Sequence, residues 1–181
     1  EKTSFAFPEL TVAQSGALDA IYTQFEDKNT VLLHGITGSG KTEIYIHLIQ
    51  EALRQGIASA HAGNTVSDIG RAVQRYVESQ GRYGIIRDLS GHGIGQSLQE
   101  GPEILNIANS NPTQLENGMT LAIEPMVSLG DWHVTIDADH WTVRTRDHSP
   151  SAHFETTLIV SDNDPEVLIS FPLVVSVDDM R

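Results

Sequence analysis

The hydrophobic residues of this chain change their spacing near residue 81, and this change constrains the fold more than any other feature. Before it, apolar residues recur at the period of an amphipathic helix in three segments, 11–25, 41–55 and 66–80. After it, short segments of alternating apolar and polar residues are separated by Gly, Asn, Asp and Pro, which is typical of strands. The gaps between these strands are too short for crossover helices, so we expect an antiparallel sheet and an α+β fold.

Capping residues and turn residues support this division. Thr11 can cap the first helix, and Thr65 with Asp68 has the spacing of a capping box at the start of the third. The expected strands lie at 82–89, 118–127, 132–138, 141–146 and 152–160. The apolar residues of 170–181 predict either an extra edge strand or a disordered tail.

Composition excludes several classes of function. The chain has 181 residues, enough for one ordinary domain but not for two complete enzymes. Its 11 Lys and Arg stand against 24 Asp and Glu, and with a net charge of -13 we expect no nucleic-acid partner. The absence of Cys excludes disulfides, thiolate metal sites and cysteine nucleophiles. No apolar run approaches the roughly 18 residues of a membrane span and the amino terminus does not resemble a signal peptide, so a cytoplasmic protein without a membrane partner is expected.

A glycine-rich motif, GITGSGKT at 35–42, matches the phosphate-binding pattern G-x-x-x-x-G-K-T in full. It lies between an apolar segment typical of a buried strand, 30–34, and the start of a helix, where amide hydrogens can converge on an anion. The motif predicts a site for ATP and magnesium made of Gly35, Gly38, Ser39, Gly40, Lys41 and Thr42, in which the lysine contacts the outer phosphates and the threonine binds the magnesium ion. The alternative is a strand-to-helix turn that binds nothing.

The segments LTVAQSGALDAIYTQF and VLLHGITGSGKTEIYIHLI, within residues 8–55, resemble the start of the motor domain of the primosomal replication helicase. The resemblance implies that Gln14 contacts adenine. The rest of the chain has neither the D-E-x-H box of that family nor its distal arginine motif, so we expect no ATP hydrolysis. Asp137, at the end of an apolar segment, is interpreted as part of an Asp-rich turn.

Residues 51–169 contain the phrases DLSGHGIG, GPEILN, ENGMTLAIEPMV and SAHFETTLIV, and they resemble the carboxy-terminal half of a type I methionine aminopeptidase. The resemblance implies half of a pita-bread fold, in which two similar halves enclose two divalent ions. It also implies that His92, Glu124 and Glu155 are metal ligands, with Glu155 bridging the ions. Imidazole and carboxylate groups suit Co, Mn, Fe or Zn. Each residue alone has a structural explanation, but together they favour a metal site.

The chain also departs from the aminopeptidase pattern. Nothing in residues 1–50 resembles the segment that supplies the two aspartate ligands and a substrate-binding histidine. Gln99 stands where a second substrate-handling histidine is expected, and an amide cannot transfer protons as imidazole does. Thr156 stands where His or Asn is usual. Three ligands hold one ion loosely and cannot form a two-metal clamp, so we expect inefficient catalysis.

Together these observations predict a P-loop segment at 1–56, an aminopeptidase-like half pita-bread at 57–169 and a tail at 170–181, in one compact unit. The favoured interpretation is a chimeric or designed scaffold, joined within 49–63, with a partial metal site and a phosphate loop. Two alternatives stay open. One is an active metalloaminopeptidase, a hydrolase that removes N-terminal methionine from peptides, in the form of a homodimer. The other is an ATP-binding module.

Overall fold

The computed structural model describes residues 10–27 and 41–171 of the chain. The described helices are α1 (Val12–Asp27), α2 (Lys41–Ala58) and α3 (Val66–Ser79), which confirms the three helices expected from the sequence. The strands that follow are β1 (Gly84–Ile85), β2 (Gly91–Ile94), β3 (Glu100–Ile104), β4 (Thr120–Ile123), β5 (Met126–Ser128), β6 (Val134–Ile136), β7 (Val143–Thr145), β8 (Ser151–His153), β9 (Glu155–Ile159) and β10 (Glu166–Phe171).

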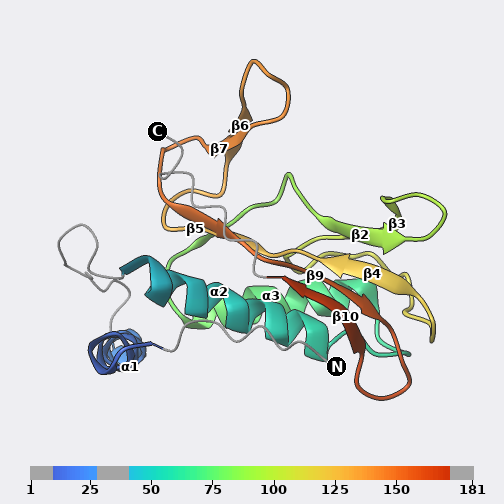
Figure 1. The fold of residues 1–181 in the computed structure, drawn as a ribbon, viewed down its shortest axis with the longest axis horizontal. Coiled ribbons are helices and arrows are strands. Elements are labelled where there is room, and N and C mark those ends of the chain that lie inside the picture. The colour runs from blue at the N-terminus through green and yellow to red at the C-terminus, as the bar shows by residue number, and fades with distance from the viewer. Residues whose placement is uncertain (1–9, 28–40, 172–181) are drawn as a thin grey trace.

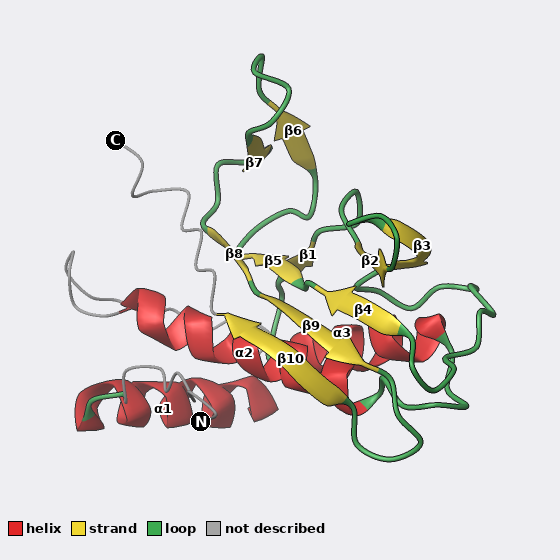
Figure 2. Cartoon of the chain, turned by 45° about the vertical axis from the view of Figure 1, so that its right-hand side comes forward, coloured by secondary structure: helices red, strands yellow, loops and turns green. Residues whose placement is uncertain are grey.

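The described strands form three sheets, and every pairing in them is antiparallel, as expected. One sheet has five strands in the order β10-β9-β4-β2-β3, a second has the order β1-β5-β8, and β6 and β7 form a hairpin. Figure 1 shows α2 and α3 side by side along one face of the sheets. In the turned view of Figure 2, α1 lies outside α2, and the β6–β7 hairpin projects on the side away from the helices.

The hydrophobic core lies between the two inner helices and the five-stranded sheet. Ile49 and Leu53 of α2, together with Ile69 of α3, pack in one buried cluster with Leu121 and Leu158 of the sheet. Full burial of a side chain of this size contributes roughly 1.5–3 kcal/mol. Helix α2 therefore crosses the predicted domain boundary at residue 56 and contributes side chains to the core of the aminopeptidase-like part.

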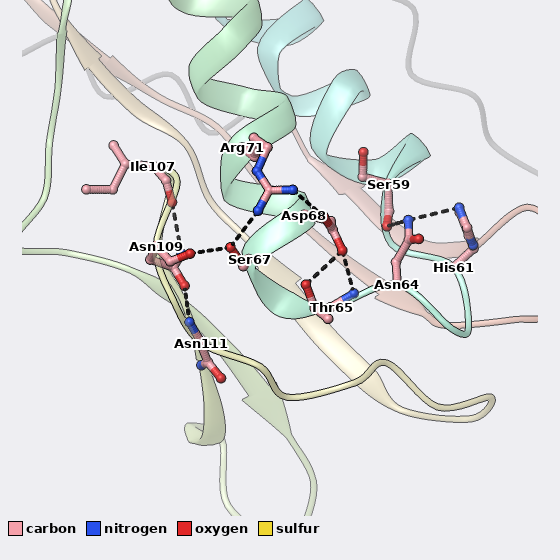
Figure 3. Close-up of polar contacts among 10 residues, drawn as sticks. All are labelled: Ser59, His61, Asn64, Thr65, Ser67, Asp68, Arg71, Ile107, Asn109 and Asn111. Atoms are coloured by element: carbon pink, nitrogen blue, oxygen red, sulfur yellow. Dashed lines mark hydrogen bonds and ion pairs between the residues drawn. The ribbon is translucent and has the colours of Figure 1, made fainter.

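The first turn of α3 is fixed by the predicted capping box, drawn in Figure 3. Asp68 Oδ2 accepts hydrogen bonds from the Thr65 backbone N–H at 2.8 Å and from the Thr65 hydroxyl at 2.7 Å. Arg71 adds an ion pair to Asp68 Oδ1 at 2.8 Å. The backbone hydrogen bond from Thr65 is the main reason that the pKa of Asp68 lies below its ordinary value.

The same helix holds the segment that follows β3. Ser67 donates its hydroxyl hydrogen to the carbonyl oxygen of Asn109 at 2.5 Å (Figure 3). Gly70 makes this close approach possible, because a Cβ at residue 70 would collide with the carbonyl oxygens of Leu105 and Ile107. The segment is thereby fixed against the helix, and it carries Asn106, which contacts the site described below.

Two expected strands are each divided in the structure. The expected strand 118–127 becomes β4 and β5, with Glu124 and Pro125 between them, and 152–160 becomes β8 and β9, with Phe154 between them. Phe154 N donates to Pro125 O at 3.2 Å, so both segments of the chain bend at the same place. The bends allow β4 of the five-stranded sheet to continue into β5 of the three-stranded one, and β8 of the three-stranded sheet to continue into β9 of the five-stranded one. A sequence pattern of simple alternation does not reveal such bends.

Strands β2, β3 and β10 were not predicted. The segment of β2 is rich in glycine and that of β3 contains Gly and Pro, so neither shows a clear alternation. Strand β10 includes the first two residues of the segment for which an edge strand or a tail was expected.

Several predictions concern residues outside the described ranges. These are the strand at 30–34, the loop residues Gly35, Gly38, Ser39 and Gly40, and the tail beyond residue 171. Of Lys41 and Thr42, only the helical backbone at the start of α2 is described. No helix in the described ranges is both long and apolar enough to cross a membrane.

Candidate metal centre

The candidate site lies where the two main sheets meet. His92 belongs to β2, Glu124 follows β4, His153 ends β8, and Glu155 begins β9. Across the β2–β4 pair, His92 lies opposite Ala122, two residues before Glu124. The bends at Pro125 and Phe154 therefore bring side chains from four strand ends to one place.

Glu124 is central to the cluster. Its Oε1 lies 3.9 Å from His92 Nε2, and its Oε2 lies 3.2 Å from His153 Nε2. One ligand atom each from Glu124, His153 and Glu155 can be chosen so that all lie within 4.8 Å of one another. The structure thus places His92 beside Glu124, and Glu124 together with Glu155. That these three residues bind a metal stays a prediction.

His153 is the member of the cluster that sequence analysis missed. The signal for it was present, because residues two apart on an extended strand point to the same face, and His153 precedes Glu155 by two. Its proximity to Glu124 depends on the two bends and could not be predicted from that spacing.

His92 is oriented by its own strand. Its Nδ1 lies 2.9 Å from the carbonyl oxygen of Gly93, which favours the tautomer with hydrogen on Nδ1 and leaves Nε2 facing Glu124. The glycines on either side are required by packing. A Cβ at Gly91 would collide with the carbonyl oxygen of Ala122, and one at Gly93 with that of Gly101.

The backbone at Glu124 is also held in place. The buried side chain of Asn106 donates from Nδ2 to the carbonyl oxygen of Glu124 at 3.1 Å. Pro125 and Phe154, both almost fully buried, lie directly beside the acidic residues in the sequence. The carboxylates thus extend from a rigid part of the core.

The donor set fits a divalent cation. Metal bonds to imidazole nitrogen or carboxylate oxygen are about 2.1 Å long, so two donors on one ion lie at most about 4.2 Å apart. The group of Glu124, His153 and Glu155, within 4.8 Å, needs only a small movement to meet that limit. Among the described residues, no Lys or Arg pairs with either carboxylate, so a cation would supply charge that the surroundings lack.

The other residues singled out in the sequence lie elsewhere or have structural contacts. Gln99 is in the exposed bend between β2 and β3. Thr156 is buried and donates its hydroxyl hydrogen to the carbonyl oxygen of Ile169 at 2.5 Å, which links β9 to β10. Asp137 follows β6 and accepts a hydrogen bond from Arg144 at 2.8 Å, in the expected turn.

Gln14 takes part in a capping box at the start of α1. Its Oε1 accepts from the backbone N–H of Thr11 at 2.8 Å, and Thr11 Oγ1 accepts from Gln14 N at 3.3 Å. The cap expected at Thr11 is confirmed, and the contact of Gln14 with adenine stays a prediction.

Comparison with known proteins identifies the family. The model of metallopeptidase family M24 matches residues 28–162, which is more than half of the chain. The chain belongs to this family. Methionine aminopeptidase of Clostridium acetobutylicum is 44% identical over 124 residues, covering 68% of this chain and 49% of that protein. Methionine aminopeptidase of Escherichia coli is 36% identical over 138 residues, covering 73% of this chain and 52% of that protein.

Solved structures agree with this assignment. The crystal structure of methionine aminopeptidase from Thermotoga maritima matches with a TM-score of 0.67 at 38% identity, over 78% of this chain and 56% of that one. The pita-bread, aminopeptidase-like fold expected from the sequence is confirmed. The chain spans about half the length of the curated relatives it matches.

The family match also covers the glycine-rich segment. It begins at residue 28 and therefore includes 35–42, where a phosphate loop was predicted. These comparisons support the aminopeptidase-like interpretation and give no support to a helicase-derived segment, a chimera or ATP binding.

Proposed function

We propose that this chain is a metal-dependent aminopeptidase of the methionine aminopeptidase type, acting on peptides with N-terminal methionine. The observation that carries the proposal is the cluster of Glu124, His153 and Glu155, with His92 at 3.9 Å from Glu124. Its support is the 36–44% identity to methionine aminopeptidases across that region. The comparisons favour this alternative over the scaffold without efficient catalysis.

The residues present suit the chemistry. A bound divalent ion polarises a peptide carbonyl and lowers the pKa of water so that it can act as the nucleophile. Glu124 and Glu155 would hold the ion through their carboxylate oxygens, and His92 through Nε2, the nitrogen not engaged by Gly93. The buried Pro125 and Phe154 keep these donors in place and exclude water from the core side of the site.

Release of methionine tests the proposal directly. The purified chain is incubated with a Met-Ala peptide and cobalt or manganese, and free methionine is measured. We expect release by the wild type and its loss in Glu155→Gln, because the amide removes a charged ligand. Glu116→Gln is the matched control, since Glu116 is exposed and outside the cluster. Absence of release at every metal concentration, in a chain that binds metal, would leave the inactive scaffold as the better interpretation.

Homodimerisation stays part of the proposal. The two halves of a pita-bread fold are similar to each other, so a second copy of this chain is our candidate for the facing half of the site. Light scattering at rising protein concentration measures the mass in solution. A constant monomer mass, together with methionine release, contradicts the dimer and leaves the peptidase intact.

Nucleotide binding rests on the sequence GITGSGKT alone. Titration with ATP and magnesium, on the wild type and on Lys41→Ala, tests it. The P-loop prediction requires weaker binding by the variant, because the lysine is expected to contact the outer phosphates. Equal affinities, or no binding to either protein, contradict it.

A further inference from the structure

The Nε2 atom of His153 lies in an environment that is unusual for a polar atom. This nitrogen is buried and has no hydrogen-bond partner among the described residues. It lies 3.2 Å from Glu124 Oε2, but the two groups are not aligned for a hydrogen bond. A buried polar atom without a partner is uncommon in native structures and needs an explanation.

An ion pair between His153 and Glu124 explains the contact incompletely. A protonated imidazole beside a carboxylate would normally direct its N–H at the oxygen, because the charge-assisted hydrogen bond is the main gain. Here the distance is short and the direction is wrong for that bond. An imidazole nitrogen that makes no hydrogen bond and lies close to two carboxylates is available to bind a cation.

The position of His153 is fixed independently of this contact. His153 pairs with Met126 across β5 and β8, and Phe154 N bonds to Pro125 O at 3.2 Å. Glu124 lies on one side of this locked segment and Glu155 on the other. Ligand atoms of His153, Glu124 and Glu155 therefore stay within 4.8 Å through backbone pairing, before any ion binds.

We infer that His153 is a metal ligand through Nε2, forming with Glu124 and Glu155 the three-residue core of a cation site. His92, 3.9 Å from Glu124, completes the donor set from β2. This chain thus supplies a second imidazole in addition to the three ligands that the sequence resemblance implies. Two imidazoles and two carboxylates favour Zn, Co, Fe or Mn over Mg and Ca, which prefer oxygen ligands.

The inference rests on the metal site of the proposed function but not on its peptidase activity. Its test is therefore cobalt binding by the full chain, followed by calorimetric titration and by the visible absorption of the bound ion. We expect His153→Ala to weaken cobalt binding by at least about tenfold, because loss of even an outer-shell partner of a ligand costs about 10–100-fold. The absorption bands of the remaining complex should shift, because a nitrogen donor is lost.

Two further proteins serve as controls for the variant. His153→Gln keeps more of the side-chain volume and should show the same loss, while circular dichroism verifies that both variants fold. His140→Asn replaces an exposed histidine of the β6–β7 turn with a residue that tolerates its φ of 60°, and it should leave cobalt binding unchanged.

The outcomes separate the inference from the proposed function. Wild-type affinity and absorption in both His153 variants, with loss of binding in Glu155→Gln, would overturn the role of His153 and leave the metal site standing. Absence of cobalt binding by the wild type would overturn both. Cobalt binding that depends on His153, without methionine release, would support the inference while the peptidase proposal fails. A wild-type crystal with cobalt should show a bond of about 2.0–2.1 Å to Nε2.

Discussion

Phe154 donates its backbone N–H to the carbonyl oxygen of Pro125, with nitrogen and oxygen 3.2 Å apart. At this point β4 continues into β5 and β8 into β9, so both segments pass from one sheet to another. Glu124 precedes Pro125, and His153 and Glu155 lie on either side of Phe154. This backbone bond therefore helps to set how far apart three potential ligands lie. The site is a consequence of how the sheets are joined, and its geometry should respond to changes in strand packing.

The packing of β2 gives the first prediction. Gly93→Ala places a Cβ against the carbonyl oxygen of Gly101, so β2 and β3 must separate. We expect a loss of about 1–3 kcal/mol in the free energy of unfolding, the usual cost of overpacking, and weaker cobalt binding because His92 moves. Urea denaturation measures the first effect and calorimetric titration the second.

Gly16→Ala is the matched control for this change. No described atom lies within 4 Å of a Cβ at Gly16, in α1, so the same substitution should stabilise the protein by roughly 0.5–1 kcal/mol. A Gly93→Ala protein as stable as the wild type would contradict the close approach of β2 and β3.

The capping box of α3 gives a prediction with a defined pH dependence. Hydrogen bonds from Thr65 and the charge of Arg71 hold the pKa of Asp68 below its ordinary value in the folded protein. Asp68 therefore stabilises the fold above its unfolded pKa, and the effect is lost as the pH falls through the folded pKa. Thr65→Ala should cost about 0.5–2 kcal/mol at neutral pH, toward the lower part of that range because the site is partly exposed to solvent.

Urea denaturation of the wild type and of Asp68→Asn, at neutral and at strongly acid pH, checks in which direction the stabilisation by Asp68 changes with pH. The variant should be less stable at neutral pH, and the difference should shrink in acid. Asp88→Asn, in the exposed segment after β1, is the control and should change stability little at either pH. A difference for Asp68→Asn that grows in acid would contradict the argument.

A substitution at Gln50 is predicted to raise the stability of the protein. This residue of α2 is 5% exposed, and neither its amide nitrogen nor its amide oxygen has a hydrogen-bond partner among the described residues. Gln50→Met replaces the unpaired amide with an apolar group of similar shape, so the free energy of unfolding should rise by about 1–3 kcal/mol. Thermal unfolding followed by circular dichroism measures the change.

Gln55→Met is the control for Gln50, because Gln55 is exposed and bonds to Glu51 at 2.7 Å on the same helix. Its effect should stay within about 0.5 kcal/mol. Destabilisation by Gln50→Met would contradict the conclusion that this buried amide is unpaired.

The sequence predicted the helices well and the site only in part, for physical reasons. Helix α3 is amphipathic and begins with its own capping residues, so local information is sufficient. Strand β2 has no alternating pattern because glycines are required where it approaches β3 and β4. His92, Glu124 and Glu155 were found by resemblance. His153 was missed because its closeness to Glu124 arises from two backbone bends that depend on sheet pairing.

Metal addition gives the last prediction, which concerns stability and not activity. A ligand that binds only the folded state stabilises it, by about 2.7 kcal/mol when its free concentration is a hundred times its dissociation constant. Manganese or cobalt should therefore raise the unfolding temperature of the chain, and a chelator should reverse the rise. Glu124→Ala should abolish the rise, because Glu124 contacts both histidines of the cluster. Glu166→Ala, exposed on β10, should retain it. Scanning calorimetry measures all three proteins, and an equal rise in Glu124→Ala would place the bound ion elsewhere on this acidic chain.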